Sequence, residues 1–139
     1  MTIPQGAFGE RVVSRLRDDR LIWLTTVGAD GTPQPNPVWF LWEEPSTVLV
    51  YNRTDAHRLE HIVSRPRVSL NFDGDGKGSN IVVLAGSARA VDARPLPHTH
   101  SSYLAKYEAS MIRVGGTLEG FSALYPVAIE ISIDRVRGF

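Results

Sequence analysis

Three side chains that can carry positive charge, Arg53, His57 and Arg58, cluster where a predicted strand gives way to a predicted helix. The free N–H groups and the dipole of a helix N-terminus attract anions, and a guanidinium can bind two phosphate oxygens at once. This pattern predicts a site for an anion, most naturally a phosphate. A solvated basic face would present the same residues, so the spacing alone leaves these two interpretations about equal.

Other patterns that could do chemistry are weaker. The segment His57–His61 fits the H-x-x-E-H pattern of inverted zinc proteases, but such a site needs a third ligand and a substantial cleft. We expect two partly exposed helix histidines and no metal. The glycine-rich segment 74–79 does not match the phosphate-binding loop pattern, and the chain has no Gly-x-Ser-x-Gly elbow. We therefore expect neither a nucleotide loop nor a hydrolase.

The composition narrows the function classes further. The chain has 139 residues, 15 Lys and Arg against 15 Asp and Glu, and no cysteine. This length predicts a single domain over residues 1–139, and the balanced charge argues against a nucleic-acid-binding protein. The absence of cysteine excludes disulfides, thiol catalysis and iron–sulfur clusters. Any chemistry must come from oxygen and nitrogen groups or from a bound cofactor.

We find no segment with the pattern of a signal peptide or of a membrane-spanning helix. Residues 1–11 contain no apolar run of signal-peptide length, and no apolar stretch approaches the ~20 residues needed to cross a bilayer. We therefore expect a cytoplasmic protein that does not contact a membrane.

The elements that must position the cationic cluster are mainly strands. β-Branched and aromatic residues are concentrated in short runs separated by turn residues, which is typical of antiparallel strands. Pro33, Pro35 and Pro37 precede the second strand and place it at an edge or a bulge, because proline cannot donate to a sheet. The pattern predicts a six-stranded, mainly β barrel with three small helices, and residues 111–121 stay unassigned. The expected strands are Leu21–Val27, Val38–Trp42, Thr47–Asn52, Val68–Phe72, Ile81–Asp92 and Val127–Ile133.

The expected helices are short. Phe8, Val12 and Leu16 recur at helical spacing in the first, which Asp18-Asp19 ends. The second covers Ala56–Val63, with Thr54 or Asp55 as its cap, and the third covers Leu96–Tyr107.

Five motifs follow one another along the chain: Thr25–Pro33, Pro37–Phe40, Val50–Asn52, His57-Arg58 and Arg65–Leu70. In this order and spacing they resemble the pyridoxamine 5′-phosphate oxidase-like superfamily, whose members are flavin-binding split β-barrels. The Val-Trp-Phe form of the second motif, together with Asp73–Gly76 and Lys106-Tyr107, looks more like the actinobacterial branch that uses the deazaflavin coenzyme F420. The resemblance covers roughly two thirds of the chain.

The resemblance implies a homodimer with cofactor sites at the subunit interface, and it implies roles for matching positions. His57 and Arg58 match a basic pair that grips the cofactor phosphate, with Arg58 the firmer of the two. Tyr51 and Asn52 match the strand end beside the phosphate, and Asn80 matches a polar residue that contacts the cofactor. The backbone of one strand would lie against the tricyclic ring, and its residues are Asn36, Pro37, Val38, Trp39 and Phe40.

The function expected from this resemblance is an oxidoreductase that moves a hydride between bound coenzyme F420 and a small organic substrate. Two alternatives stay open: an FMN-dependent oxidase or reductase on the same fold, and a non-catalytic carrier of flavin, deazaflavin or another tetrapyrrole-like or anionic ligand. Arg53, Arg58 and Lys77 could hold the longer anionic tail of F420. Leu41 stands where pyridoxamine phosphate oxidases place a basic residue, and the chain ends soon after the sixth strand, so we do not expect vitamin B6 oxidation. The residues offer no evident catalytic acid or base beyond four tyrosines, Tyr51, Tyr103, Tyr107 and Tyr125.

Overall fold

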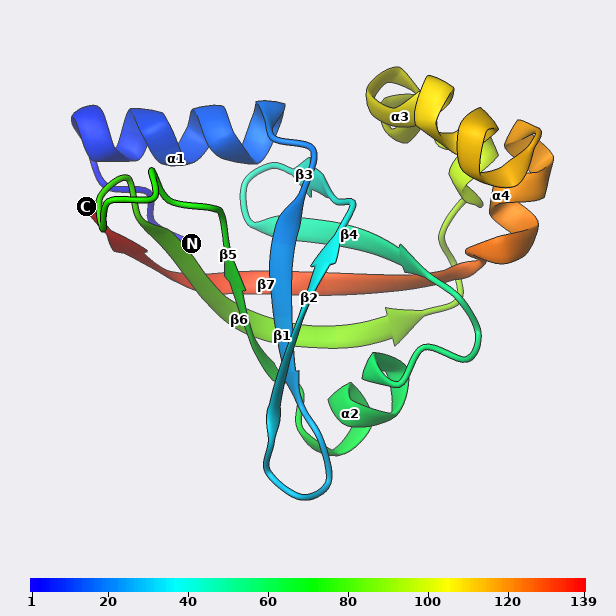
Figure 1. Cartoon of the computed structure of the whole chain (residues 1–139), viewed down its shortest axis with the longest axis horizontal. Helices are drawn as coiled ribbons and strands as arrows, with labels where there is room; N and C mark the ends of the chain where they lie inside the picture. Colours follow the sequence, from blue (N-terminus) through cyan, green and yellow to red (C-terminus); the bar gives the residue numbers. More distant parts are fainter.

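A computed structural model describes all residues from Met1 to Phe139. One antiparallel sheet of seven strands, in the order β2-β1-β5-β6-β7-β4-β3, curls into a half-barrel (Figure 1). The expected mainly β split barrel is therefore confirmed, with seven strands instead of six. The strands are β1 (Ile22–Val27), β2 (Pro33–Val38), β3 (Leu41–Glu43), β4 (Thr47–Asn52), β5 (Arg67–Asn71), β6 (Val82–Val91) and β7 (Val127–Gly138).

The extra strand arises where the predicted strand Val38–Trp42 is wrong. The chain leaves the sheet after Val38 and returns to it at Leu41, so β2 and β3 are separate strands. They also form the two opposite edges of the sheet. Only Trp39 and Phe40 join them, and a step of 3.8 Å per residue spans little distance. The sheet must therefore curl until its edges nearly meet, and the split of the barrel falls at this turn.

The prolines of β2 fit its position at the edge. Pro33, Pro35 and Pro37 pair in register with Val27, Thr25 and Trp23 of β1. Successive residues of an antiparallel strand direct their N–H groups to opposite sides, so the missing donors of residues 33, 35 and 37 all lie on one side of β2. The expected edge position is confirmed.

Four helices surround the sheet: α1 (Ala7–Asp18), α2 (Arg58–Ser64), α3 (Ser101–Gly115) and α4 (Leu118–Leu124), with a 3-10 turn at Pro97–Thr99. In Figure 1 α1, α2 and the α3–α4 pair occupy three separate places around it. The predicted cap of α2 is wrong, because His57 precedes the helix and neither Thr54 nor Asp55 caps it. The predicted helix Leu96–Tyr107 instead begins at Ser101 and extends to Gly115.

The unassigned glycine-rich segment is the joint between α3 and α4. A Cβ atom on Gly115 would lie 2.2 Å from the backbone nitrogen of Phe121, so only glycine allows the two helices to approach this closely. Gly116 follows at φ 78°, a left-handed conformation that ends α3. This joint brings Phe121 back toward the sheet.

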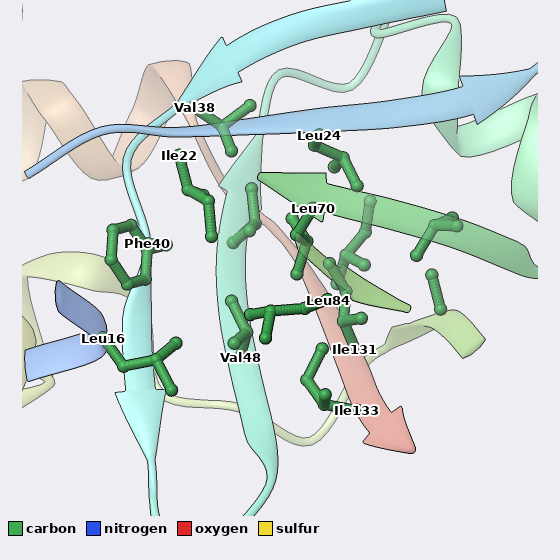
Figure 2. Packing of buried hydrophobic residues seen from close by; sticks show 14 of the residues in the cluster. Leu16, Ile22, Leu24, Val38, Phe40, Val48, Leu70, Leu84, Ile131 and Ile133 are labelled. Carbon is green, nitrogen blue, oxygen red and sulfur yellow. The ribbon is translucent and has the colours of Figure 1, made fainter. Parts of the chain in front are cut away.

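Residues of β4 belong to two different hydrophobic clusters. Val48 and Val50 belong to the barrel core, part of which appears in Figure 2. Leu49 and Tyr51, on the other face, pack against buried residues of α3 and α4. Because successive side chains of a strand point to opposite faces, β4 is buried on both sides. No helix is both long and apolar enough to span a membrane.

Candidate functional site

A cavity of about 330 Å³ lies where the turn after β2, the end of β4 and the start of α2 meet α3 and α4. Its volume falls within the range of small-molecule sites. Most of its lining is hydrophobic, and two arginines supply the charge. The lining residues are Pro37, Val38, Trp39, Tyr51, Arg53, Ala56, Arg58, Tyr103, Val114, Phe121 and Tyr125.

Stacked aromatic rings form much of the wall. The Trp39 indole is nearly parallel to Tyr107 and to Phe121, with ring centroids 4.9 Å and 5.3 Å away. Phe121 stacks in turn on Tyr125 at 4.8 Å, and Tyr51 meets Tyr103 edge-on at 4.9 Å. Such pairs hold one another in place and give a rigid, apolar wall suited to a planar ligand.

Arg58 is held at this cavity by Asn52. Its Nη1 donates to Asn52 Oδ1 at 2.8 Å, while Asn52 Nδ2 donates to the carbonyls of Val50 and Val127 at 3.0 and 3.1 Å. With both amide donors used on backbone carbonyls, the Asn52 oxygen is fixed toward the guanidinium. Burial lowers the pKa of Arg58, and no carboxylate forms a salt bridge with it.

Arg53 supplies a second guanidinium to the same cavity. Its Cζ lies 4.9 Å from the centroid of the Tyr125 ring, and it too forms no salt bridge. Arg53 is exposed, whereas Arg58 is half-buried, and a partly desolvated charge without a counter-ion is unfavourable in the folded protein. Two guanidinium groups that line one apolar cavity therefore form a site suited to an anion.

Two of the lining tyrosines, Tyr51 and Tyr103, carry phenols that are harder to ionise than usual. Burial raises the pKa of Tyr51 to about 12, and its hydroxyl donates to the Pro95 carbonyl at 2.5 Å. Burial also raises the pKa of Tyr103 well above its usual range. Both phenols stay protonated at neutral pH, so neither serves as a general base there.

An ion-pair network holds the segment that leads into α3. Arg94 pairs with Glu43 of β3 and Glu130 of β7, with an Nη2–Oε2 distance of 2.9 Å to Glu130. The guanidinium lowers the pKa of Glu43, and His100, which precedes α3, lies 3.5 Å from the same carboxylate. The network therefore anchors this segment to β3 and β7. Arg94 is adjacent to Pro95, whose carbonyl accepts from Tyr51.

The structure brings together part of the predicted set. Five of its residues line the cavity: Pro37, Val38, Trp39, Tyr51 and Arg58. Asn52 does not line the cavity but accepts a hydrogen bond from Arg58. The other four lie outside the lining. Asn36 is exposed on β2, His57 is exposed before α2, Phe40 is buried in the barrel core, and Asn80 precedes β6.

Asn80 and Lys77 lie beyond the far end of β6 from the cavity. At the other end of β6, Val91 pairs with Ala128 of β7. The adjacent residue of β7, Val127, pairs with Asn52 beside the cavity. The ten residues of β6 separate the two ends by roughly 30 Å. Asn80 has φ 59°, and its buried Oδ1 has no hydrogen-bond partner. Lys77 therefore does not join Arg53 and Arg58 within one chain.

The H-x-x-E-H segment does not form a metal centre in this structure. His61 Nδ1 lies 2.8 Å from the Thr26 hydroxyl of β1. No group of three or more His, Cys, Asp or Glu side chains is arranged to hold a metal ion.

Three cavity residues, Ala56, Val114 and Phe121, were not singled out from the sequence, and two others, Tyr103 and Tyr125, were named only as candidate acids or bases. A signal for some of them was present. Tyr103, Tyr107, Met111 and Val114 follow helical spacing, as do Phe121 and Tyr125. The spacing predicts an apolar helix face, but it does not say which part of the sheet that face covers.

The family model described as pyridoxamine 5′-phosphate oxidase matches residues 8–138 of this chain. Among curated proteins no sequence matches it. An F420 reductase of known structure has a TM-score of 0.69 at 22% identity, with 97% of this chain and 98% of that chain covered.

Two further solved structures share the fold. A Clostridium acetobutylicum protein described as of the pyridoxinephosphate oxidase family has a TM-score of 0.65 at 16% identity, covering 91% of this chain and 81% of that one. HutZ, a haem storage protein of Vibrio cholerae, has a TM-score of 0.61 at 16% identity, with 93% of each chain covered. At these identities the likeness establishes the fold alone.

Proposed function

The chain belongs to the pyridoxamine 5′-phosphate oxidase family, and from this premise we propose that it is an oxidoreductase that binds a phosphate-bearing flavin or deazaflavin at the aromatic cavity. The observation that carries the proposal is Arg58, a half-buried guanidinium fixed by Asn52 and lacking any carboxylate partner. An anionic ligand would supply the missing counter-charge.

The residues present fit such a cofactor. Arg58 and Arg53 would hold the phosphate, with bidentate contacts available to each guanidinium. The wall of Trp39, Phe121 and Tyr125 offers an apolar surface for the planar ring system. When bound, the cofactor would supply the hydride donor or acceptor, while the protein orients it and excludes water. The neutral phenol of Tyr51 is a proton-bearing group at the cavity.

We propose coenzyme F420 as the cofactor, with a small organic molecule as the second substrate. The support is the Val38–Phe40 motif and the likeness in fold to an F420 reductase. FMN is the alternative, since both cofactors join a planar tricyclic ring to a phosphate. A carrier without catalytic activity is a further alternative, and a haem storage protein shares the fold. The cavity lining contains no histidine, cysteine or methionine, the side chains that most often bind haem iron.

Direct titration tests the proposal. Purified protein is titrated with oxidised F420, reduced F420, FMN and haem, and binding is followed by fluorescence or absorbance. Tightest binding of F420 is the expected result. Preference for FMN would replace F420 in the proposal, and a protein that binds only haem, or none of the four, would overturn it.

Arg58→Ala locates the ligand. We expect at least a tenfold loss of F420 affinity in this variant, because a charge-assisted contact to the phosphate is removed. Arg17→Ala on α1, which removes an exposed arginine from another helix, is the matched control. Equal affinities of the two variants would exclude the phosphate role of Arg58.

We also propose that the working unit is a homodimer in which residues of both chains contact the cofactor. Asn36, His57 and Asn80 do not line the cavity of one chain, and a second chain could bring them to it. Light scattering coupled to size-exclusion chromatography measures the mass, and 15.4 kDa would exclude the dimer. The single domain over residues 1–139 stays a prediction.

A further inference from the structure

The turn that joins the two sheet edges, Trp39-Phe40, is held by α3 rather than by a strand. The Phe40 N–H donates to the Tyr107 hydroxyl at 3.0 Å. The Phe40 carbonyl lies 3.1 Å from the same hydroxyl and accepts from Lys106 Nζ at 3.0 Å. Both backbone groups of this residue therefore depend on two adjacent side chains of one helix. We call the pair Trp39-Phe40 the edge turn.

The hydroxyl of Tyr107 cannot satisfy every group around it. It carries one proton, and three groups surround it: the Phe40 N–H, the Phe40 carbonyl and the Arg20 carbonyl. The Arg20 carbonyl is the nearest acceptor, at 2.7 Å. Tyr107 thus accepts from the Phe40 N–H and donates to Arg20. Lys106 is then the donor that satisfies the Phe40 carbonyl, since a buried carbonyl without a partner is unfavourable.

Trp39 immediately precedes Phe40 in the chain and lines the cavity. Its indole stacks on Tyr107 at an angle of 6°. One helix therefore holds both the backbone that follows Trp39 and a ring packed against its side chain. We propose that Lys106 is a positioning residue: its ammonium, together with Tyr107, fixes the edge turn and so sets where the Trp39 indole lies in the cavity wall.

The charge of Lys106 is part of this arrangement. Its Nζ lies 3.8 Å from the centroid of the Phe40 ring and 5.3 Å from that of Tyr107, and it forms no salt bridge. A neutral amine would lose both cation–π attractions and donate a weaker hydrogen bond. Deprotonation of Lys106 should therefore loosen the edge turn and move Trp39.

The surroundings place this deprotonation near neutral pH. The pKa of Lys106 is lowered to about 8, mainly by burial and in part by the Arg20 guanidinium, while the Asp19 and Asp18 carboxylates oppose these effects. The Tyr107 phenol, which also contacts the turn, has its pKa raised to about 12 by burial. A transition of Trp39 near pH 8 would thus report on the lysine and not on the phenol.

The test follows Trp39 by ¹⁹F NMR of protein labelled with 5-fluorotryptophan, without any ligand. Trp39→Phe assigns its resonance among the three tryptophans, and Trp23, which donates to Asp73, is the internal control. In the wild type we expect the Trp39 resonance to move with a midpoint near pH 8 while Trp23 stays in place. No movement of Trp39 between pH 6.5 and 9.5 would overturn the inference.

Substitution gives the second arm. At pH 7, Lys106→Met should shift the Trp39 resonance and abolish its titration, whereas Lys106→Arg, which keeps a charged donor, should restore the wild-type position. Unchanged Trp39 resonances in Lys106→Met would contradict the inference. If that variant does not fold, the wild-type titration decides alone.

A ligand arm rests on the proposed function and uses FMN as the probe. We expect Lys106→Met to weaken FMN binding several-fold and Lys106→Arg to retain it. Failure of FMN to bind the wild type would count against FMN at this site and leave the NMR result intact. Normal FMN affinity in Lys106→Met, together with an unmoved Trp39, would refute the positioning role.

Discussion

Asn52 holds Arg58 at the cavity: the asparagine Oδ1 accepts from the arginine Nη1 at 2.8 Å. The asparagine is itself buried at the end of β4 and spends both amide protons on backbone carbonyls of β4 and β7. The sheet thus determines the orientation of a cationic side chain that arises from α2. The end of β4 and the start of α2 together fix one guanidinium group at the cavity.

Removal of this support should affect both stability and binding. Asn52→Ala leaves the Val50 and Val127 carbonyls without their side-chain partner and frees the Arg58 guanidinium. We expect a loss of about 1–3 kcal/mol in the free energy of unfolding. Affinity for a phosphate-bearing ligand should fall as well. Urea denaturation and ligand titration measure the two effects, and an Asn52→Ala protein as stable as the wild type would contradict this role.

The aromatic wall should depend strongly on Phe121. Its ring is 2% exposed and stacks on both Trp39 and Tyr125. Phe121→Ala should destabilise the protein by about 3–5 kcal/mol, since a buried phenyl ring leaves a void. Phe121→Leu retains much of the volume and should lose less. Equal midpoints of the two variants in chemical denaturation would show that the wall is not tightly packed.

The joint between α3 and α4 should not tolerate a side chain at Gly115. A Cβ atom there would lie 2.2 Å from the Phe121 nitrogen, so the helices must separate in Gly115→Ala. We expect a loss of about 1–3 kcal/mol from overpacking, together with a wider cavity. Ala109→Ser, on an exposed position of α3, is the control and should behave like the wild type. Thermal unfolding that shows no difference between these variants would disprove the close approach.

The Arg94–Glu43 pair predicts a loss of stability in acid. The guanidinium lowers the pKa of Glu43 in the folded protein below its ordinary value of 4.5. The pair therefore stabilises the fold above the unfolded pKa, and this contribution disappears as the pH falls through the folded pKa. Thermal unfolding measured from pH 7 to pH 3 should show a smaller decline for Glu43→Gln than for the wild type. Parallel declines would show that this carboxylate does not contribute.

Much of the fold follows from the sequence itself. Alternating apolar residues identify β5 because a strand places successive side chains on opposite faces, and runs rich in β-branched and aromatic residues identify β1 and β4. Prolines at every second position predict an edge or a bulge here, because each removes a donor on the same side, and β2 is an edge strand. The cationic cluster of Arg53, His57 and Arg58 also marks the strand-to-helix junction beside the cavity. These features are local, and neighbouring residues in the chain are enough to define them.

Only the tertiary structure decided how the site is completed. Val38–Trp42 has the composition of one strand, but closure of the curled sheet forces a turn at Trp39-Phe40 that Lys106 and Tyr107 of α3 then hold. The contribution of Phe121 and Tyr125 to the cavity depends on a helix joint whose packing partners lie far away in the chain. The burial of Arg58 and the absence of a carboxylate beside it likewise arise from the whole fold. A short sequence pattern can show which groups carry charge, but only long-range packing decides which of them are buried without a counter-ion.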